Sequence, residues 1–113
     1  MFYLCLSCSR LNKNNIHIKV SESEHNYSLD AKYKESETRA IDNYLDDHLG
    51  KGNHISFINT RINADLTLND GTKFYMDKAP GKLIIKFNKD ENSMASYINI
   101  KDLAEGLKPI MSK

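Results

Sequence analysis

The tripeptide Asn69-Asp70-Gly71 lies between two short runs in which apolar and polar residues alternate. Residues 64–68 form the first run, and Phe74 and Met76 share one face of the second. Asn, Asp and Gly tolerate the positive φ angles that tight hairpin turns require. Alternation with a period of two is the pattern of a half-buried strand. The segment therefore predicts a β-hairpin.

The alternation continues on both sides of this hairpin. After a turn at residues 77–81, a strand is expected over Lys82–Asn88, and further strands are expected over His54–Ile62 and Met94–Ile98. Residues 54–98 therefore predict an antiparallel β-meander. The side chains expected to face the helices are Phe74, Met76, Leu83, Ile85 and Phe87.

Two helices are expected beside the meander. Residues 30–50 contain no Pro, and their apolar residues recur at intervals of three and four, with Gly50 as the stop. A second helix is expected over residues 99–110, with Asn99 as its N-cap and Pro109 ending or kinking it. Two amphipathic helices can cover one face of the meander.

The first 29 residues are expected to form an N-terminal β-hairpin and a loop. Apolar and polar residues alternate over residues 2–6 and again over residues 16–20, with a polar, turn-rich segment between them. A chain of 113 residues has room for one domain only. The sequence therefore predicts a single α+β domain over residues 1–113.

Charge, the length of apolar runs and cysteine content limit the partners and the compartment that we expect. The 16 Lys and Arg residues almost balance the 15 Asp and Glu residues, so nucleic acid is an unlikely partner on global charge. No run approaches the about 18 apolar residues of a membrane span, and no membrane partner is expected. With only two cysteines the chain is unlike a disulfide-rich secreted domain, which predicts a cytoplasmic protein; export after synthesis stays open.

Cys5 and Cys8 are spaced as half of a zinc site, and His17 and His25 could complete it. The histidine spacing does not match that of a zinc finger, and the segment after Cys8 is a poor helix for a redox motif. These residues are weak metal candidates. We expect neither a metal nor another cofactor.

No catalytic motif is recognisable. Acidic residues and histidines gather near the end of the first helix, at Asp42, Asp46, Asp47, His48 and His54, where we expect a solvated helix end. The chain lacks a Gly-x-Ser-x-Gly elbow and a phosphate-binding loop. We therefore expect a non-enzymatic protein, with a small enzyme whose site is assembled from scattered residues as an alternative.

The outward face of the meander is the candidate binding surface. It is expected to carry Lys73, Tyr75, Lys82, Ile84 and Lys86. An aromatic and an aliphatic side chain among lysines can bind a protein or a single-stranded nucleic acid that stacks on the tyrosine. Alternatively, the N-terminal hairpin covers Tyr75 and Ile84, and the face is part of the core.

The order helix, three-stranded meander, helix over about residues 36–108 is similar to the small chaperones of bacterial type III secretion. The strongly acidic composition and the later strands of that family are missing, so no residue role is carried over. Many Lys, Asn, Ile and Ser residues and no Trp indicate an AT-rich gene, typical of a phage or of a horizontally acquired bacterial locus. We expect a small protein-binding accessory domain, with a secretion-chaperone-like protein or a nucleic-acid-binding accessory protein as alternatives. The last strand of the meander, if its edge is exposed, could pair with a second copy to form a homodimer.

Overall fold

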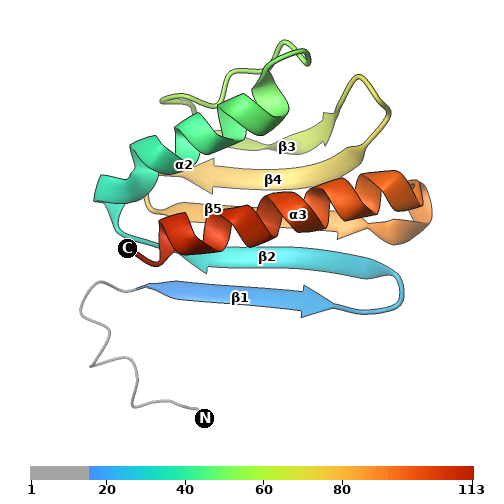
Figure 1. Ribbon diagram of the computed structural model, residues 1–113, viewed down its shortest axis with the longest axis horizontal. Helices are drawn as coiled ribbons and strands as arrows, with labels where there is room; N and C mark the ends of the chain where they lie inside the picture. Colours follow the sequence, from blue (N-terminus) through green and yellow to red (C-terminus); the bar gives the residue numbers. More distant parts are fainter. Residues whose placement is uncertain (1–15) are drawn as a thin grey trace.

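An antiparallel sheet of five strands, in the order β1-β2-β5-β4-β3, forms one layer of the molecule, and both long helices lie on one face of it (Figure 1). The computed structural model describes residues 16–113. Short helical turns at Glu35–Glu37, Asp46–Gly50 and Lys89–Glu91 flank the helices. The strands and helices are β1 His17–Glu22, β2 Asn26–Lys32, α2 Thr38–Leu45, β3 Ile62–Thr67, β4 Lys73–Ala79, β5 Lys82–Asn88 and α3 Met94–Met111.

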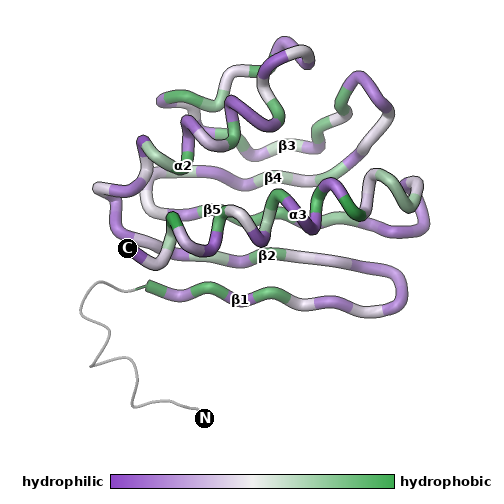
Figure 2. Tube along the Cα trace, viewed as in Figure 1, coloured by the Kyte–Doolittle hydropathy of each residue, from purple (hydrophilic) through white to green (hydrophobic). Residues whose placement is uncertain are grey.

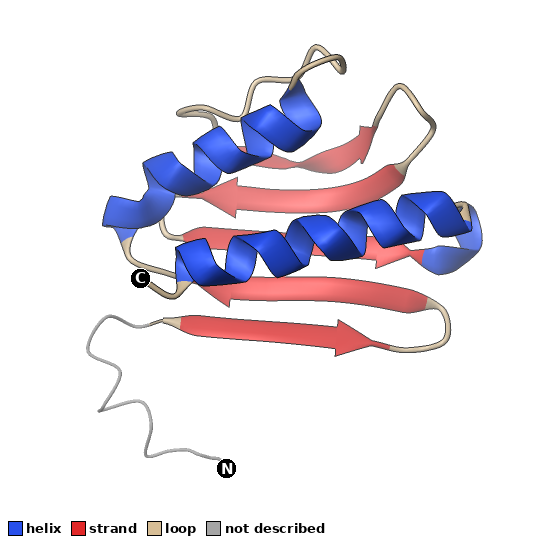
Figure 3. Cartoon of the chain, viewed as in Figure 1, coloured by secondary structure: helices blue, strands red, loops and turns tan. Residues whose placement is uncertain are grey.

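The predicted α+β class is confirmed, and β3, β4 and β5 form the meander (Figure 3). The turn at residues 69–71 joins β3 to β4, and the Gly71 amide donates to the Leu68 carbonyl over 2.9 Å. The next turn is shorter than expected, because β4 continues to Ala79. Pro80 and Gly81 alone connect it to β5, and Gly81 has a φ of 76° that a residue with a side chain rarely adopts.

The meander buries one face under the helices, as the alternation predicts. The five meander residues expected there are at most 4% exposed, and β2, α2 and α3 contribute further buried side chains. This core includes Tyr27, Leu29, Ala31, Ile41, Leu45, Phe57, Phe74, Met76, Leu83, Ile85, Phe87, Ile100, Leu103 and Leu107. One continuous apolar layer therefore joins the sheet to both helices.

The N-terminal hairpin differs from the prediction. The described hairpin pairs β1 with β2, and the strand expected at residues 2–6 lies outside the described residues. Residues 26–32, expected to be a loop and the start of a helix, form β2, because Tyr27, Leu29 and Ala31 alternate and are buried. Figure 2 shows the same alternation along β1. The first helix consequently begins at Thr38 and not at residue 30.

Two strands expected in the meander are absent from it. Residues 54–61 form an irregular loop in which His54 and Asn59 have positive φ angles of 58° and 54°, incompatible with a strand. Residues 94–98 belong to α3, which begins at Met94 because the Ser93 hydroxyl accepts a hydrogen bond from the Ser96 amide over 3.0 Å. The helix therefore begins five residues before Asn99, the expected N-cap, and the last strand of the chain is β5, inside the sheet.

The helix ends also have physical reasons that differ from those expected. The first helix does end at Gly50, through a π-helical turn, but Gly50 is required for space: a Cβ there would lie 2.5 Å from the Ile55 carbonyl oxygen. α3 continues through Pro109 to Met111. In the part of the chain that the structure describes, no helix combines the length and the apolar character needed to cross a lipid bilayer.

Candidate functional site

The five residues of the predicted surface share one face of the sheet, opposite the helices. Lys73 and Tyr75 lie on β4, and the other three lie on β5. Tyr75 is directly opposite Lys86 in the strand register, and Ala79 is opposite Lys82. We call this set the outer-face surface; its members are Lys73, Tyr75, Lys82, Ile84 and Lys86.

β1 and β2 extend the sheet edge to edge and do not fold across this face. β2 pairs with β5, and Asp30 of β2 lies opposite Ile84. Tyr75 and Ile84 are both half-buried, and within residues 16–113 no helix lies over them (Figure 1). The described β1–β2 hairpin therefore does not cover this face, and residues 1–15 of the expected N-terminal hairpin lie outside the described residues.

Tyr75 is held in a fixed orientation. Its hydroxyl donates to the Asn63 side-chain oxygen over 2.6 Å, and the Lys86 ammonium lies 5.7 Å from the centre of its ring. A hollow of about 460 Å³ opens beside it, lined by Lys73, Tyr75 and Lys86 of the outer-face surface. Three residues that line this hollow are therefore among the five predicted from the sequence.

Carboxylates that the sequence analysis missed lie among the lysines. Asp77 forms an ion pair of 3.0 Å with Lys82 and is opposite Ile84 in the register. Asp65 is opposite Tyr75 on β3, and Glu91 also lines the hollow. The alternation that predicted the lysines also places Asp65 and Asp77 on this face, so both could have been found from the sequence.

The weak metal candidates do not come together in the described residues. Cys5 and Cys8 lie outside those residues. His17 begins β1, whereas His25 follows the other end of β1 and bonds through Nδ1 to Asp90 over 2.8 Å. Within residues 16–113 no group of three His, Cys, Asp or Glu side chains is placed to hold a metal ion.

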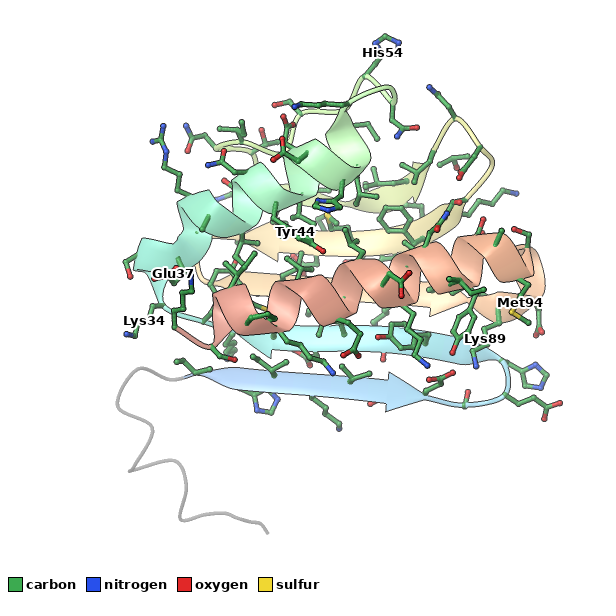
Figure 4. The ribbon with its side chains drawn as sticks, viewed as in Figure 1. Lys34, Glu37, Tyr44, His54, Lys89 and Met94 are labelled. Atoms are coloured by element: carbon green, nitrogen blue, oxygen red, sulfur yellow. The ribbon has the colours of Figure 1, made fainter. Side chains whose placement is uncertain are left out.

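The acidic residues near the end of the first helix are only partly solvated. Asp42 is 1% exposed, and its Oδ1 lies 2.8 Å from the ammonium of Lys78, which is also buried. The other Asp42 oxygen accepts the Asn59 amide over 3.0 Å, and Asp46 accepts the Phe57 amide over 3.3 Å. The expected solvated helix end is wrong for these two residues, which fasten the loop after the helix. Asp47, His48 and His54 are exposed as expected, and His54 points away from the molecule (Figure 4).

A second hollow, which the sequence analysis did not find, lies between the two helices. It has a volume of about 540 Å³ and lies between the π-helical turn, the β3–β4 turn and α3. We call it the helix groove. Its apolar lining consists of Leu49, Leu68, Ile100 and Leu103.

Tyr44 and His48 form the aromatic wall of the helix groove. Their rings stack with centres 4.0 Å apart, and Figure 4 shows Tyr44 on the side of α2 that faces α3. The Tyr44 hydroxyl donates to the Leu103 carbonyl over 3.2 Å, beside Gly106, where a Cβ would lie 2.0 Å from that hydroxyl. His48 Nδ1 lies 2.8 Å from the Tyr44 carbonyl, and among the described residues its Nε2 has no hydrogen-bond partner. Gly106 thus allows the close approach that fixes this wall.

The helix groove has an excess of negative charge. Asp70 accepts the Thr72 amide over 2.9 Å, and the amide and hydroxyl of Thr72 hold the pKa of the Asp70 carboxyl below its usual range. Burial, and secondly the charge of Asp102, raises the pKa of Tyr44. The lining contains two basic side chains, His48 and Lys51, and the Lys51 ammonium pairs with Asp47 over 3.2 Å. Asp70 and Asp102 have no ion-pair partner among residues 16–113.

Comparison of the chain with protein-family models, with curated proteins and with solved structures gives no match.

Proposed function

We propose that this protein is a non-enzymatic binding module and that the outer-face surface contacts another protein. The observation that carries the proposal is the half-buried pair Tyr75 and Ile84, which lies on a sheet face that no described helix covers. A tyrosine whose ring is already fixed loses little conformational entropy on binding, and tyrosine is among the residue types that dominate interface energetics.

The mixed charge of this face favours a protein partner over a nucleic acid. Lys73 and Lys86 could pair with carboxylates of a partner, and Asp65 could pair with a basic residue. A phosphate backbone would gain from the lysines but be repelled by Asp65 and Glu91 in the same hollow. The proposal therefore specifies a polar interface with both signs of charge.

Affinity capture from the native host tests this proposal. A double variant, Tyr75→Ala with Ile84→Ala, should lose the captured protein while keeping its melting temperature nearly unchanged, because neither side chain belongs to the buried core. The matched control is Lys19→Ala with Lys32→Ala, on the same face but on β1 and β2. Equal capture by wild type and the double variant would refute the proposal. Salt-sensitive retention on a single-stranded DNA column would instead favour a nucleic-acid ligand.

A secretion-chaperone-like role is the second candidate. The order α2, β3, β4, β5, α3 agrees with the resemblance drawn from the sequence. A chaperone of this kind would bind an unfolded segment of an exported protein, so capture of a partner that binds only when unfolded would favour this candidate. We also propose that the protein acts in the cytoplasm of a bacterium, or of a bacterium infected by a phage that encodes it, from the cysteine content and the Lys- and Asn-rich composition.

Homodimerisation through a sheet edge is a separate proposal. The edge strands of the described sheet are β1 and β3, because β5, the last strand of the meander, lies between β2 and β4. Unpaired backbone groups on an edge strand can pair with a second copy. Light scattering of the purified protein should give twice the monomer mass; a monomer mass at all concentrations would contradict it.

A further inference from the structure

The helix groove lies on the opposite side of the sheet from the outer-face surface and has the properties of a small-molecule site. Its volume of about 540 Å³ is within the range of about 300–1,000 Å³ typical of ligand pockets. Its lining combines an apolar and aromatic part with polar side chains of the two turns and of α3, so it can contact both an apolar body and a charged group. The charges and aromatic rings of this lining indicate which ligand it suits.

The carboxylates of the helix groove select a cation. Asp70 accepts the Thr72 amide over 2.9 Å, and this bond, together with the Thr72 hydroxyl, lowers the pKa of the Asp70 carboxyl. Asp102 lines the α3 side of the helix groove together with Tyr44, whose pKa is raised by burial and secondly by the charge of Asp102. The ammonium of Lys51 is engaged by Asp47, so the described lining supplies no free lysine or arginine to neutralise Asp70 and Asp102.

The aromatic wall also favours a cation. The stacked rings of Tyr44 and His48 are fixed by the bonds that each makes to a backbone carbonyl. An organic cation near the Tyr44 ring gains from the negative charge of the aromatic face. A bare metal ion would not use this wall or the apolar lining, and within residues 16–113 no metal-binding group of side chains is present.

We propose that the helix groove binds a small organic cation, namely a primary amine on an apolar or aromatic body. The body lies against Leu68, Ile100 and Leu103, and the ammonium group is recognised by Asp102 and Asp70. The charge complementarity comes from two carboxylates without ion-pair partners among the described residues. The apolar lining supplies the area that a metal ion or an inorganic cation could not bury.

Titration of the full chain with tyramine, followed by backbone amide NMR and calorimetry, tests the proposal. Tyramine should bind saturably, with a Kd below about 1 mM, and shift amides of the π-helical turn, the β3–β4 turn and the first half of α3. Tyrosol, in which a hydroxyl replaces the ammonium group, should bind at least about tenfold more weakly. Equal binding of the two probes, or no saturation with tyramine up to about 10 mM, would overturn the proposal.

The variant Asp102→Asn should weaken tyramine binding by at least about tenfold and leave tyrosol binding unchanged. Asp102 is exposed, so this variant is expected to fold, and its amide spectrum verifies this. Asp65→Asn is the matched control, because it removes the same charge from the outer face. If both variants lost the same affinity for tyramine, the effect would come from net charge in general, and recognition by the helix groove would be refuted. The result is independent of the partner proposed for the outer-face surface.

Discussion

Two neighbouring residues of β4, Asp77 and Lys78, point to opposite faces of the sheet, and their ion pairs differ in exposure to solvent. Lys78 and Asp77 each form an ion pair: Lys78 with Asp42, in which both side chains are 2% exposed, and Asp77 with Lys82, in which they are 22% and 41% exposed. The two distances, 2.8 and 3.0 Å, are almost equal. The difference therefore lies in solvation, and it separates residues that maintain the fold from residues that are free to bind.

The largest effect should come from breaking the inner ion pair. Lys78→Met leaves the Asp42 carboxylate buried without its cation, which should lower the free energy of unfolding by about 3–5 kcal/mol. Urea denaturation monitored by circular dichroism measures this loss. The double variant Lys78→Met with Asp42→Leu should recover much of the stability, because no unpaired charge remains. A loss in the single variant of less than about 1 kcal/mol would show that water reaches this pair.

The two adjacent isoleucines of β5 give a second comparison. Ile85 is 1% exposed and packs in the core, so Ile85→Ala should cost about 2–5 kcal/mol. Ile84 faces outward between Asp30 and Asp77, so Ile84→Ala should cost less than about 1 kcal/mol. Urea denaturation of the two variants side by side measures the difference. Similar losses would mean that a further part of the chain covers the outer face.

Tyr27 is a buried defect of the inner face. It is 1% exposed, and its hydroxyl has no hydrogen-bond partner among the described residues. Replacing it by phenylalanine removes an unsatisfied polar atom and keeps the ring, so Tyr27→Phe should stabilise the fold by about 1 kcal/mol. A destabilisation of similar size would show that the hydroxyl has a partner in solution.

The same residue gives a pH dependence. Burial raises the pKa of Tyr27 to about 12, above the value of about 10 in an unfolded chain. The folded state therefore favours the neutral phenol, and this stability is present below about pH 10 and lost as the pH rises towards 12. Urea unfolding at about pH 8 and pH 11 measures the change in the free energy of unfolding. This free energy should fall less between the two pH values for Tyr27→Phe than for wild type. An identical loss in both proteins would contradict the assignment to Tyr27.

The inner face could be predicted from sequence because burial produces alternation. Phe74, Met76, Leu83, Ile85 and Phe87 repeat at every second position and are all buried. Tyr27, Leu29 and Ala31 of β2 alternate in the same way, but the polar residues before and between them favoured a loop, so this strand was missed. The segment Met94–Ile98 is compatible with a strand and with a helix. It forms a helix because the Ser93 hydroxyl caps the first turn.

The two candidate sites also differ in how far the sequence predicts them. The outer-face surface follows from the alternation, so five of its residues could be identified, although Asp65 and Asp77 were overlooked. The helix groove depends on contacts between segments far apart in the sequence. Gly106 approaches Tyr44, and the β3–β4 turn approaches the loop after the π-helical turn through the bond from the Asn69 amide to the Asn53 side chain. No periodicity indicates such contacts, and an acidic residue such as Asp102 is indistinguishable in sequence from a solvated one.

The smallest effect should come from the outer ion pair. Lys82→Met removes the partner of Asp77, but water solvates the carboxylate that remains, so the free energy of unfolding should change by less than about 1 kcal/mol. The measurement is urea denaturation at low and at high salt, because screening should remove even this small difference while leaving the loss in Lys78→Met almost intact. A loss in Lys82→Met that equals the loss in Lys78→Met and persists in high salt would mean that the outer pair is shielded from water as the inner one is. The outer-face surface would then be part of an interface already formed in the purified protein, and the contrast between the two faces would no longer separate folding from binding.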